Sequence, residues 1–365
     1  MRGRAKPDPD PPVRSSGDAR QHRSTGRTGI GPSHGAYQLS FSVRAMACEF
    51  EFLFNLGQCE QADRAALAAI ERVEPLEQQM SFFRSSSELN RINAVASLQS
   101  IEVEPGLFEL LATSKKIWEE TQGAFDITAS PLWRIWGFAD HRPRVPDDAE
   151  IRETLRCVGS QYLELDASAC RVRFRQEDLE LNLGSIGKGY ALDRCAACLN
   201  EAEIGDYLCH AGYSSIIARG TRWRAPEVPE PEGGWPIGVA HPLRPGERLG
   251  ILRLHDSALG TSGSALQFFR HRGKRYGHVI DPRTGYPADH FLSVTVVAPT
   301  ATEADALATA FFVMQPDEIE RYCRSHPEVG ALLIRPGRTP RAPEIIHVGA
   351  ELDFRPCDPG EPPQV

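Results

Sequence analysis

Polar and apolar residues alternate between residues 37 and 56 with the period of two that half-buried strands show. The polar positions are Gln38, Ser40 and Ser42, and the apolar positions are Leu39, Phe41 and Val43. This pattern predicts strands that meet near Met46, as in a β-hairpin.

Further along the chain, helical and strand patterns follow one another. Apolar residues at helical spacing predict helices over 61–79, 108–120, 190–199 and 302–314, and Ser85 to Ser87 offer N-caps for a short additional helix. Short apolar runs predict strands over 214–218, 235–240, 250–254 and 293–297. Because no repeat of fixed length connects them, we expect an α+β fold with mixed or antiparallel sheets and flanking helices.

The two ends of the chain differ in composition from its middle. Residues 1–36 are rich in Arg, Pro, Ser and Gly and nearly lack large apolar side chains, which is typical of a disordered tail. The last residues, 351–365, are again rich in Pro and polar groups. We therefore expect one globular domain over 37–350 between an N-terminal and a C-terminal tail.

Composition narrows the function classes. The 365 residues are 41% hydrophobic and carry 41 Lys and Arg against 49 Asp and Glu, so the formal net charge is −8. Such a chain lacks the overall positive field that nucleic-acid binding uses. The nine scattered cysteines favour a reducing compartment. No apolar run has the length of a signal peptide or a membrane span, so we expect a cytoplasmic protein without membrane insertion.

A carboxylate and a hydroxyl fall on one face of the helix predicted over 302–314. Asp305 and Thr309 are four residues apart, and their oxygens suit a hard cation such as Mg²⁺. A solvated or capping pair explains the same spacing, so the pattern alone leaves both interpretations open.

The segment from Gly277 to Pro287 combines turn residues with His278 and Asp281. A histidine near a carboxylate is a common arrangement for proton transfer, although Asp-Pro and Thr-Gly also stabilise turns without any catalytic role.

A glycine-punctuated loop, Leu183 to Gly189, leads into the predicted helix 190–199. Its backbone N–H groups and Lys188 suit a phosphate, but the glycine spacing matches neither the Walker nor the Rossmann pattern. A purely structural helix start explains the glycines as well.

Two further clusters also have a structural explanation. Trp133, Trp136 and Phe138 follow Gly-Ala-Phe-Asp-Ile-Thr at 123–128 and suit either a flat ligand or the core. Cys195 and Cys198 form a Cys-x-x-Cys without a second pair at metal spacing, so we expect structural thiols.

Taken in order, these segments resemble the ApbE family of FAD:protein FMN transferases from Val43 to Leu333. The matching segments are Met46 with the residues after it, Met80 to Asn90, Gly123 to Thr128, Leu183 to Ala191, Thr261 to Gly263, His278 to Pro287 and Asp305 to Thr309. Several such blocks in register are far more specific than any one of them.

The resemblance implies a full set of roles. An FAD site would be lined by Met46, Phe83, Ala124, Phe125, Asp126, Asn182, Lys188 and Ile280. Asp305, Thr309 and the backbone carbonyl of Ser185 would bind Mg²⁺, with Mn²⁺ as the alternative. His278 would accept a proton while FMN moves from FAD to a Thr or Ser of an acceptor flavoprotein and AMP leaves.

The chain departs from the family pattern at several positions. Asn182 replaces the usual Asp, Phe83 the usual Tyr, Ala47 and Cys48 the usual Gly-Thr, and Tyr213 interrupts a double glycine. The first two substitutions remove a charge or a hydrogen-bonding group that could orient the flavin. These substitutions leave a non-catalytic FAD-binding module open as an alternative. A second alternative has water as the acceptor, which would make the protein an FAD pyrophosphatase that releases FMN and AMP.

Overall fold

The computed structural model describes residues 38–55, 58, 62–222, 233–264, 267–339 and 342–357. The N-terminal tail predicted over 1–36 lies outside these residues, as does the end of the chain from 358 onward. Among the residues that are described, none of the helices combines the length and apolarity needed to cross a membrane.

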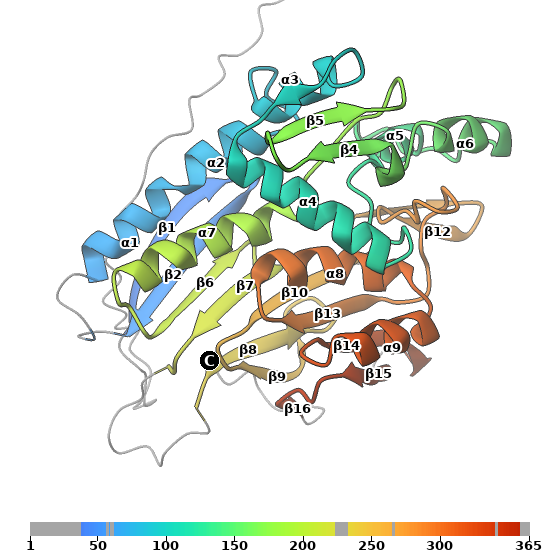
Figure 1. Cartoon of the computed structure of the whole chain (residues 1–365). Coiled ribbons are helices and arrows are strands. Elements are labelled where there is room, and N and C mark those ends of the chain that lie inside the picture. Colours follow the sequence, from blue (N-terminus) through green and yellow to red (C-terminus); the bar gives the residue numbers. More distant parts are fainter. Residues whose placement is uncertain are drawn as a thin grey trace, which may run out of the picture.

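An antiparallel sheet of eight strands forms the middle layer of the fold (Figure 1). In spatial order its strands are β1 (Gln38–Ala45), β2 (Cys48–Asn55), β6 (Tyr207–Ala211), β7 (Ser215–Arg219), β10 (Ala258–Gly263), β13 (Ser293–Ala298), β14 (Gly330–Thr339) and β15 (Ala342–Gly349). All the pairings are antiparallel. Every side chain of β6 is buried, so this strand is covered on both faces.

Helices cover one face of this sheet, and Figure 1 shows α1, α7 and α8 lying across its strands. The helices that share the main hydrophobic core are α1 (Ala62–Glu71), α2 (Val73–Met80), α3 (Glu88–Val95), α4 (Pro105–Glu120), α7 (Gly187–Glu201), α8 (Ala301–Val313) and α9 (Pro316–Ser325). α8 is buried around almost its whole circumference, which fits its nearly uninterrupted apolar sequence.

A small sheet covers the opposite face. Its strands, in order, are β16 (Phe354–Pro356), β9 (Arg248–Leu254) and β8 (Trp235–Ala240). Trp235 and Leu252 of this sheet pack with Leu208 and Ile216 of the main sheet in a second core. The predicted C-terminal tail over 351–365 thus includes a strand, because Phe354 pairs with β9 and packs against this second core.

The remaining elements form an extension at one end of the helical layer, toward the upper right in Figure 1. They are α5 (Ser130–Ile135), α6 (Asp148–Leu155), the 3-10 helix η1 (Ser160–Tyr162), the sheet β3 (Ile101–Glu102), β5 (Arg171–Phe174) and β4 (Leu163–Asp166), and the hairpin β11 (Phe268–His271) and β12 (Lys274–Gly277). Trp136, Ile151 and Ile280 lie in a third, smaller core of this region.

The predicted α+β architecture is confirmed, with differences in detail. Met46 and Ala47 form the tight turn between β1 and β2, as the alternation predicted. The helix expected over 61–79 is two helices, α1 and α2, with Arg72 between them. Pro75 explains the break, since a proline lacks the N–H that a continuous helix would bond and is tolerated in a first turn.

Close backbone contacts bring α7, α8 and β10 together. A β-carbon added to Gly189 of α7 would lie 2.0 Å from the carbonyl oxygen of Ala301, and one added to Gly260 of β10 would lie 2.1 Å from that of Ala304. Asp193 of α7 accepts the N–H groups of Ala301 (2.9 Å) and Thr302 (2.8 Å), so it caps the N-terminus of α8. Only glycine allows these elements to approach so closely.

We predict that Gly260→Ala destabilises the protein by roughly 1–3 kcal/mol, because the added methyl group overlaps the backbone of α8. Urea denaturation followed by circular dichroism measures the change. Gly205→Ala is the matched control, since nothing lies within 4 Å of its added β-carbon. Equal unfolding free energies for the Gly260 variant and the wild type would contradict this role of the glycine.

Candidate active site

A cavity of about 1100 Å³ opens where the extension, the starts of α7 and α8 and the small sheet meet. Of the residues that the sequence marked as a site, those that line it are Phe83, Ala124, Phe125, Asp126, Asn182, Ser185, Lys188, His278, Ile280, Asp305 and Thr309. They come from segments as far apart in the sequence as Phe83 and Thr309. The fold therefore gathers all but one of the predicted site residues around one cavity.

Met46 is the exception. It is a turn residue with a positive φ of 48°, and its half-buried side chain packs against the main core rather than lining the cavity. Cys48 of the same hairpin lies under Gly212, where an added β-carbon would come within 2.9 Å of the Cys48 Cβ, and Gly212 does line the cavity. The predicted contact of Met46 with FAD stays a prediction.

Asp305 is the central charged group of the site. Its side chain is on the first half of α8, and the residue is only 5% exposed. Its Oδ1 accepts the Ser215 hydroxyl at 2.9 Å, its Oδ2 accepts the Gly189 N–H at 3.1 Å, and the Lys188 Nζ lies 3.4 Å from both oxygens. A buried carboxylate needs such partners, because burial alone would strongly disfavour its charge.

Thr309 lies one helical turn beyond Asp305 and also faces the cavity. Its Oγ1 is 3.2 Å from the Oγ of Ser262 on β10, so α8 and β10 present adjacent hydroxyls. Asp305 and Thr309 supply a carboxylate and a hydroxyl, which are oxygen ligands of the kind that Mg²⁺ prefers, and Ser185 lines the same cavity. The donor chemistry at this end of the cavity therefore fits a hard divalent cation.

The start of α7 differs from the simple phosphate cradle that its glycines suggested. The Gly187 N–H donates to the Leu183 carbonyl at 2.7 Å, and the Gly189 N–H donates to Asp305. These two groups are therefore bonded within the protein. Lys188, half-buried between them, remains the group that can meet an anion, since its 3.4 Å separation from each Asp305 oxygen is a loose contact.

Asn182 holds the loop before α7 in place. Its N–H donates to the Ile127 carbonyl at 2.7 Å, its Oδ1 accepts the Gly184 N–H at 2.9 Å, and its Nδ2 is 3.4 Å from the Ser130 Oγ. An amide can donate to Ser130, which an ionised carboxylate cannot do. The departure from the family pattern at this position is therefore compatible with an ordered cavity wall.

Asp126 has a structural role in this wall. It accepts hydrogen bonds from Thr128 and Ser160, each through both the backbone N–H and the hydroxyl. Burial raises the pKa of this carboxyl above its usual value, while the four hydrogen bonds act in the opposite direction. Its neighbours Ala124 and Phe125 are also buried, so this segment fixes the shape of the cavity.

His278 directly follows β12 and is half-buried at the cavity. Its Nδ1 lies 3.2 Å from the Gln267 carbonyl oxygen. Because a carbonyl only accepts, this contact places the proton on Nδ1 and leaves Nε2 free to accept another. Burial lowers the pKa of the imidazole from its usual value, which favours the neutral ring.

Asp281 is not the partner of His278. Its carboxylate bonds instead to the guanidinium of Arg283, with the closest contact at 3.0 Å, and to the backbone of the same turn. The proximity of the two residues in sequence suggested a proton-transfer pair. The tight turn instead directs the carboxylate along its own loop, and the histidine takes a carbonyl partner.

The aromatic cluster is divided between cavity and core. Trp133 lines the cavity and stacks against Phe138 with 6.5 Å between ring centroids. Trp136 is fully buried and donates its indole N–H to the Gly285 carbonyl at 2.9 Å. Phe83 lies at the rim and is 80% exposed, so its ring is free to cover a ligand.

Some residues that shape the site were not recognised in the sequence. Arg270 and Arg275 of the β11–β12 hairpin line the cavity. Ser215 is fully buried outside the cavity lining and donates to Asp305. Ser262, which bonds Thr309, belongs to the segment Thr261 to Gly263 that matches the family pattern. The hairpin had a visible signal in its run of basic residues, whereas nothing near Ser215 marks it.

The Cys-x-x-Cys pair lies on α7, away from the cavity lining. Cys195 is buried, its Sγ is 3.2 Å from the Ala69 carbonyl oxygen, and burial raises its pKa to about 12. Cys198 packs against the main core. In the described part of the chain, no three His, Cys, Asp or Glu side chains are grouped for a metal.

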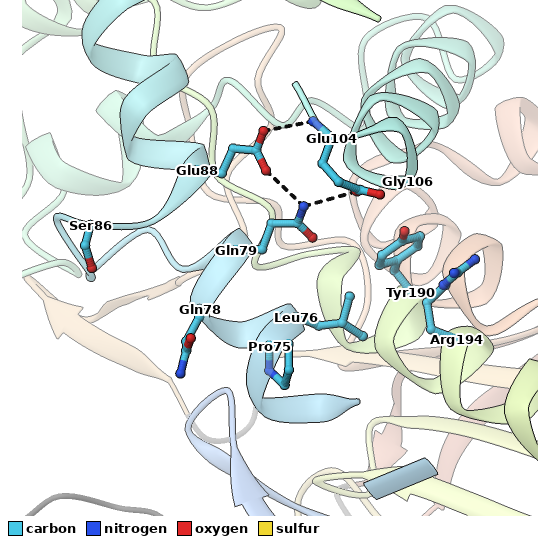
Figure 2. A pocket seen from close by; sticks show the side chains of 10 residues that line it. All are labelled: Pro75, Leu76, Gln78, Gln79, Ser86, Glu88, Glu104, Gly106, Tyr190 and Arg194. Carbon is cyan, nitrogen blue, oxygen red and sulfur yellow. Dashed lines mark hydrogen bonds between the residues drawn. The ribbon is translucent and has the colours of Figure 1, made fainter. Parts of the chain in front are cut away.

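A second, smaller cavity of about 480 Å³ lies between α2, α4 and α7 (Figure 2). The Gln79 amide donates to Glu88 at 2.9 Å and to Glu104 at 3.1 Å, and both hydrogen bonds are drawn in Figure 2. Glu88 also accepts the Glu104 N–H, and Glu104 caps α4 at the Leu107 N–H. These groups satisfy one another and join three helices, and this cavity shares no lining residue with the larger one.

Comparison with known proteins decides the family. Residues 40–333, most of the chain, match the model of the ApbE family. The chain belongs to the ApbE family. The match begins in β1 and ends in β14, so it includes every element that contributes to the larger cavity.

Relatives and solved structures of ApbE proteins agree with this assignment. The protein named FAD:protein FMN transferase from Escherichia coli is 32% identical over 68% of this chain and 70% of its own length. The protein of the same name from Treponema pallidum is also 32% identical, over 75% of this chain and 79% of its own length. The flavin transferase ApbE from Vibrio cholerae superposes with a TM-score of 0.73 at 26% identity, covering 86% of this chain and 98% of its own. The ApbE protein from Thermotoga maritima superposes with a TM-score of 0.69 at 30% identity, covering 82% of this chain and 94% of its own.

We predict that the His278 imidazole of this ApbE protein titrates below pH 6.5, because burial penalises its charged form. Nuclear magnetic resonance of the ring protons across a pH series measures the pKa, and the urea-unfolded chain supplies the reference. Since the folded pKa is lowered, the ring takes up its proton at a lower pH in the folded protein than in the unfolded chain. A folded pKa at or above the unfolded value would contradict this placement.

Proposed function

We propose that this protein transfers the FMN half of FAD to a Thr or Ser hydroxyl of an acceptor protein and releases AMP. The observation that carries the proposal is that Lys188, Asp305, Thr309 and His278 line one cavity. A cation-binding end and a neutral histidine are the two features that transfer from a pyrophosphate requires. The relatives from Escherichia coli and Treponema pallidum are named FAD:protein FMN transferase, which agrees with transfer of FMN from FAD to a protein.

The reaction breaks one bond of the pyrophosphate and forms another. The oxygen of the acceptor hydroxyl bonds to the phosphorus of the FMN half, while the anhydride bond to AMP breaks. His278 Nε2 takes the proton of the hydroxyl, which is scarcely ionised at neutral pH. The charge of Lys188, which lines the same cavity, would offset the negative charge on the pyrophosphate oxygens.

Asp305, Thr309 and the Ser185 carbonyl are the residues proposed to bind Mg²⁺, with Mn²⁺ as the alternative. Bound there, the ion would supply further positive charge to the pyrophosphate and polarise its oxygens. Ser215 and the Gly189 N–H hold the carboxylate in position for this role.

The flavin would lie along the wall that Ala124 to Asp126, Asn182 and Ile280 form, with Phe83 as a cover at the rim. An aromatic ring without a hydroxyl still stacks on a flat ligand, so Phe83 retains the apolar part of the contact. We place the reaction in the cytoplasm, because the scattered cysteines suit a reducing compartment.

We predict that purified protein, FAD and Mg²⁺ add one FMN to an acceptor protein and release an equal amount of AMP. Acceptors are identified first, by mass spectrometry of flavin-bearing proteins in host cells with and without this chain. Intact-mass measurement of the acceptor and chromatography of the nucleotides then give both products. Release of FMN and AMP without acceptor labelling would indicate hydrolysis instead, and FAD binding without AMP release would indicate a non-catalytic module.

We predict that Asp305→Asn lowers the rate of transfer at least about a hundredfold, because it removes the charge at the cation-binding end. Thr309→Ala should raise the Mg²⁺ concentration needed for half-maximal rate. Thr154→Ala on α6, which removes a helix hydroxyl outside the cavity, is the control. Urea denaturation verifies that each variant is folded, and a wild-type Mg²⁺ dependence in both site variants would refute the metal assignment.

A further inference from the structure

The β11–β12 hairpin carries a strong positive charge in an otherwise acidic protein. Arg270, Arg272, Lys274 and Arg275 lie within six residues, whereas the whole chain has a net charge of −8. Lys274 has a distant acidic neighbour, with its Nζ 4.0 Å from Asp289. In the described part of the chain, no carboxylate pairs with Arg270, Arg272 or Arg275 within 4.0 Å.

Two features of the hairpin are unfavourable for its own stability. Arg270 and Arg275 are directly opposite each other across the strands, and like charges in that position repel. Arg272 occupies the turn with a φ of 49°, a conformation that favours Asn or Gly over a long side chain. Positions at which a sequence violates local preferences are often functional ones.

Arg270 and Arg275 lie where a bound protein segment can contact them. Arg275 is fixed, because its guanidinium lies 4.0 Å from the centre of the Phe268 ring and donates to the Ser264 carbonyl. Arg270 is exposed, and both arginines line the cavity together with Phe268 and His278. The hairpin thus places the fixed guanidinium of Arg275, the exposed guanidinium of Arg270 and the aromatic ring of Phe268 beside the proposed base.

His278 follows the last residue of β12 directly, so an acceptor hydroxyl bound at this base lies beside the hairpin. The position of Arg275 three residues before His278 corresponds to about 10 Å of strand, and the turn at Arg272 to about 20 Å. An extended acceptor segment would reach these points about three and six residues away from the reacting hydroxyl.

We propose that the β11–β12 hairpin is the docking surface for the acceptor protein and that it binds an acidic segment next to the acceptor Thr or Ser. The proposal rests on the proposed function, because it is the acceptor that must approach His278. Carboxylates of the segment pair with Arg270 and Arg272, and its apolar side chains lie against Phe268. Paired carboxylates would also relieve the repulsion between Arg270 and Arg275.

Binding of peptides tests the surface without requiring catalysis. Three fluorescent peptides of equal length carry one threonine, with aspartates, asparagines or lysines about three and six residues from it. Fluorescence anisotropy with the full chain should show tightest binding of the aspartate peptide, weakened by added salt. Equal affinity for the three peptides would overturn the proposal.

Charge reversal locates the surface on the protein. Arg270→Glu and Arg272→Glu should each weaken binding of the aspartate peptide roughly tenfold. The affinities for the aspartate peptide and the lysine peptide should then differ less than in the wild type. Arg64→Glu, an equal charge change on the exposed face of α1, is the matched control and should bind as the wild type does. Unchanged binding by both hairpin variants would overturn the proposal.

A kinetic measurement separates this proposal from the proposed function. With an identified acceptor protein, Arg272→Glu should raise KM for the acceptor roughly tenfold, with kcat and the affinity for FAD unchanged, since Arg272 does not line the cavity. Charge-selective peptide binding without any FMN transfer would refute the proposed function and leave the docking surface in place. Normal transfer with an unchanged acceptor KM in this variant would refute the docking surface alone.

Discussion

The contact between the backbones of α7 and α8 determines the geometry of the cavity. Gly189 allows the two helices to approach closely, and its N–H group donates to the buried carboxylate of Asp305. The same approach brings Lys188 within reach of that carboxylate, and Asp193 of α7 caps α8 one turn earlier. A side chain at position 189 would separate the helices, and Lys188 would then no longer lie beside Asp305.

Much of the fold could be predicted because its signals are local. The strand over 235–240 has the predicted limits, and the buried helix α8 begins within one residue of its prediction. Ser87 caps α3 through its hydroxyl, as the serine run suggested. The order of the family segments along the chain also predicted which distant residues would line the cavity, except Met46.

The remaining features depend on tertiary contacts that no local pattern encodes. Ser215 reaches Asp305 across 90 residues, because β7 lies beside β10 and under α8. The N–H groups at the start of α7 looked free for a phosphate, but the folded chain uses those of Gly187 and Gly189 itself. Asp281 and His278 were close in sequence, yet the turn assigns them different partners. In each of these cases the tertiary fold determines which hydrogen-bond partner a group has, and the local sequence does not.

His278 and Asp305 belong to parts of the molecule with different sequence constraints. Asp305 lies in a helix whose surface is almost entirely packed, where most substitutions disturb the core. His278 follows a two-stranded ribbon that is separate from the main sheet and whose side chains are largely exposed. Substitutions in the hairpin are therefore expected to disturb the core less than substitutions in the helices, so the surface beside His278 can change while the packing around Asp305 is kept.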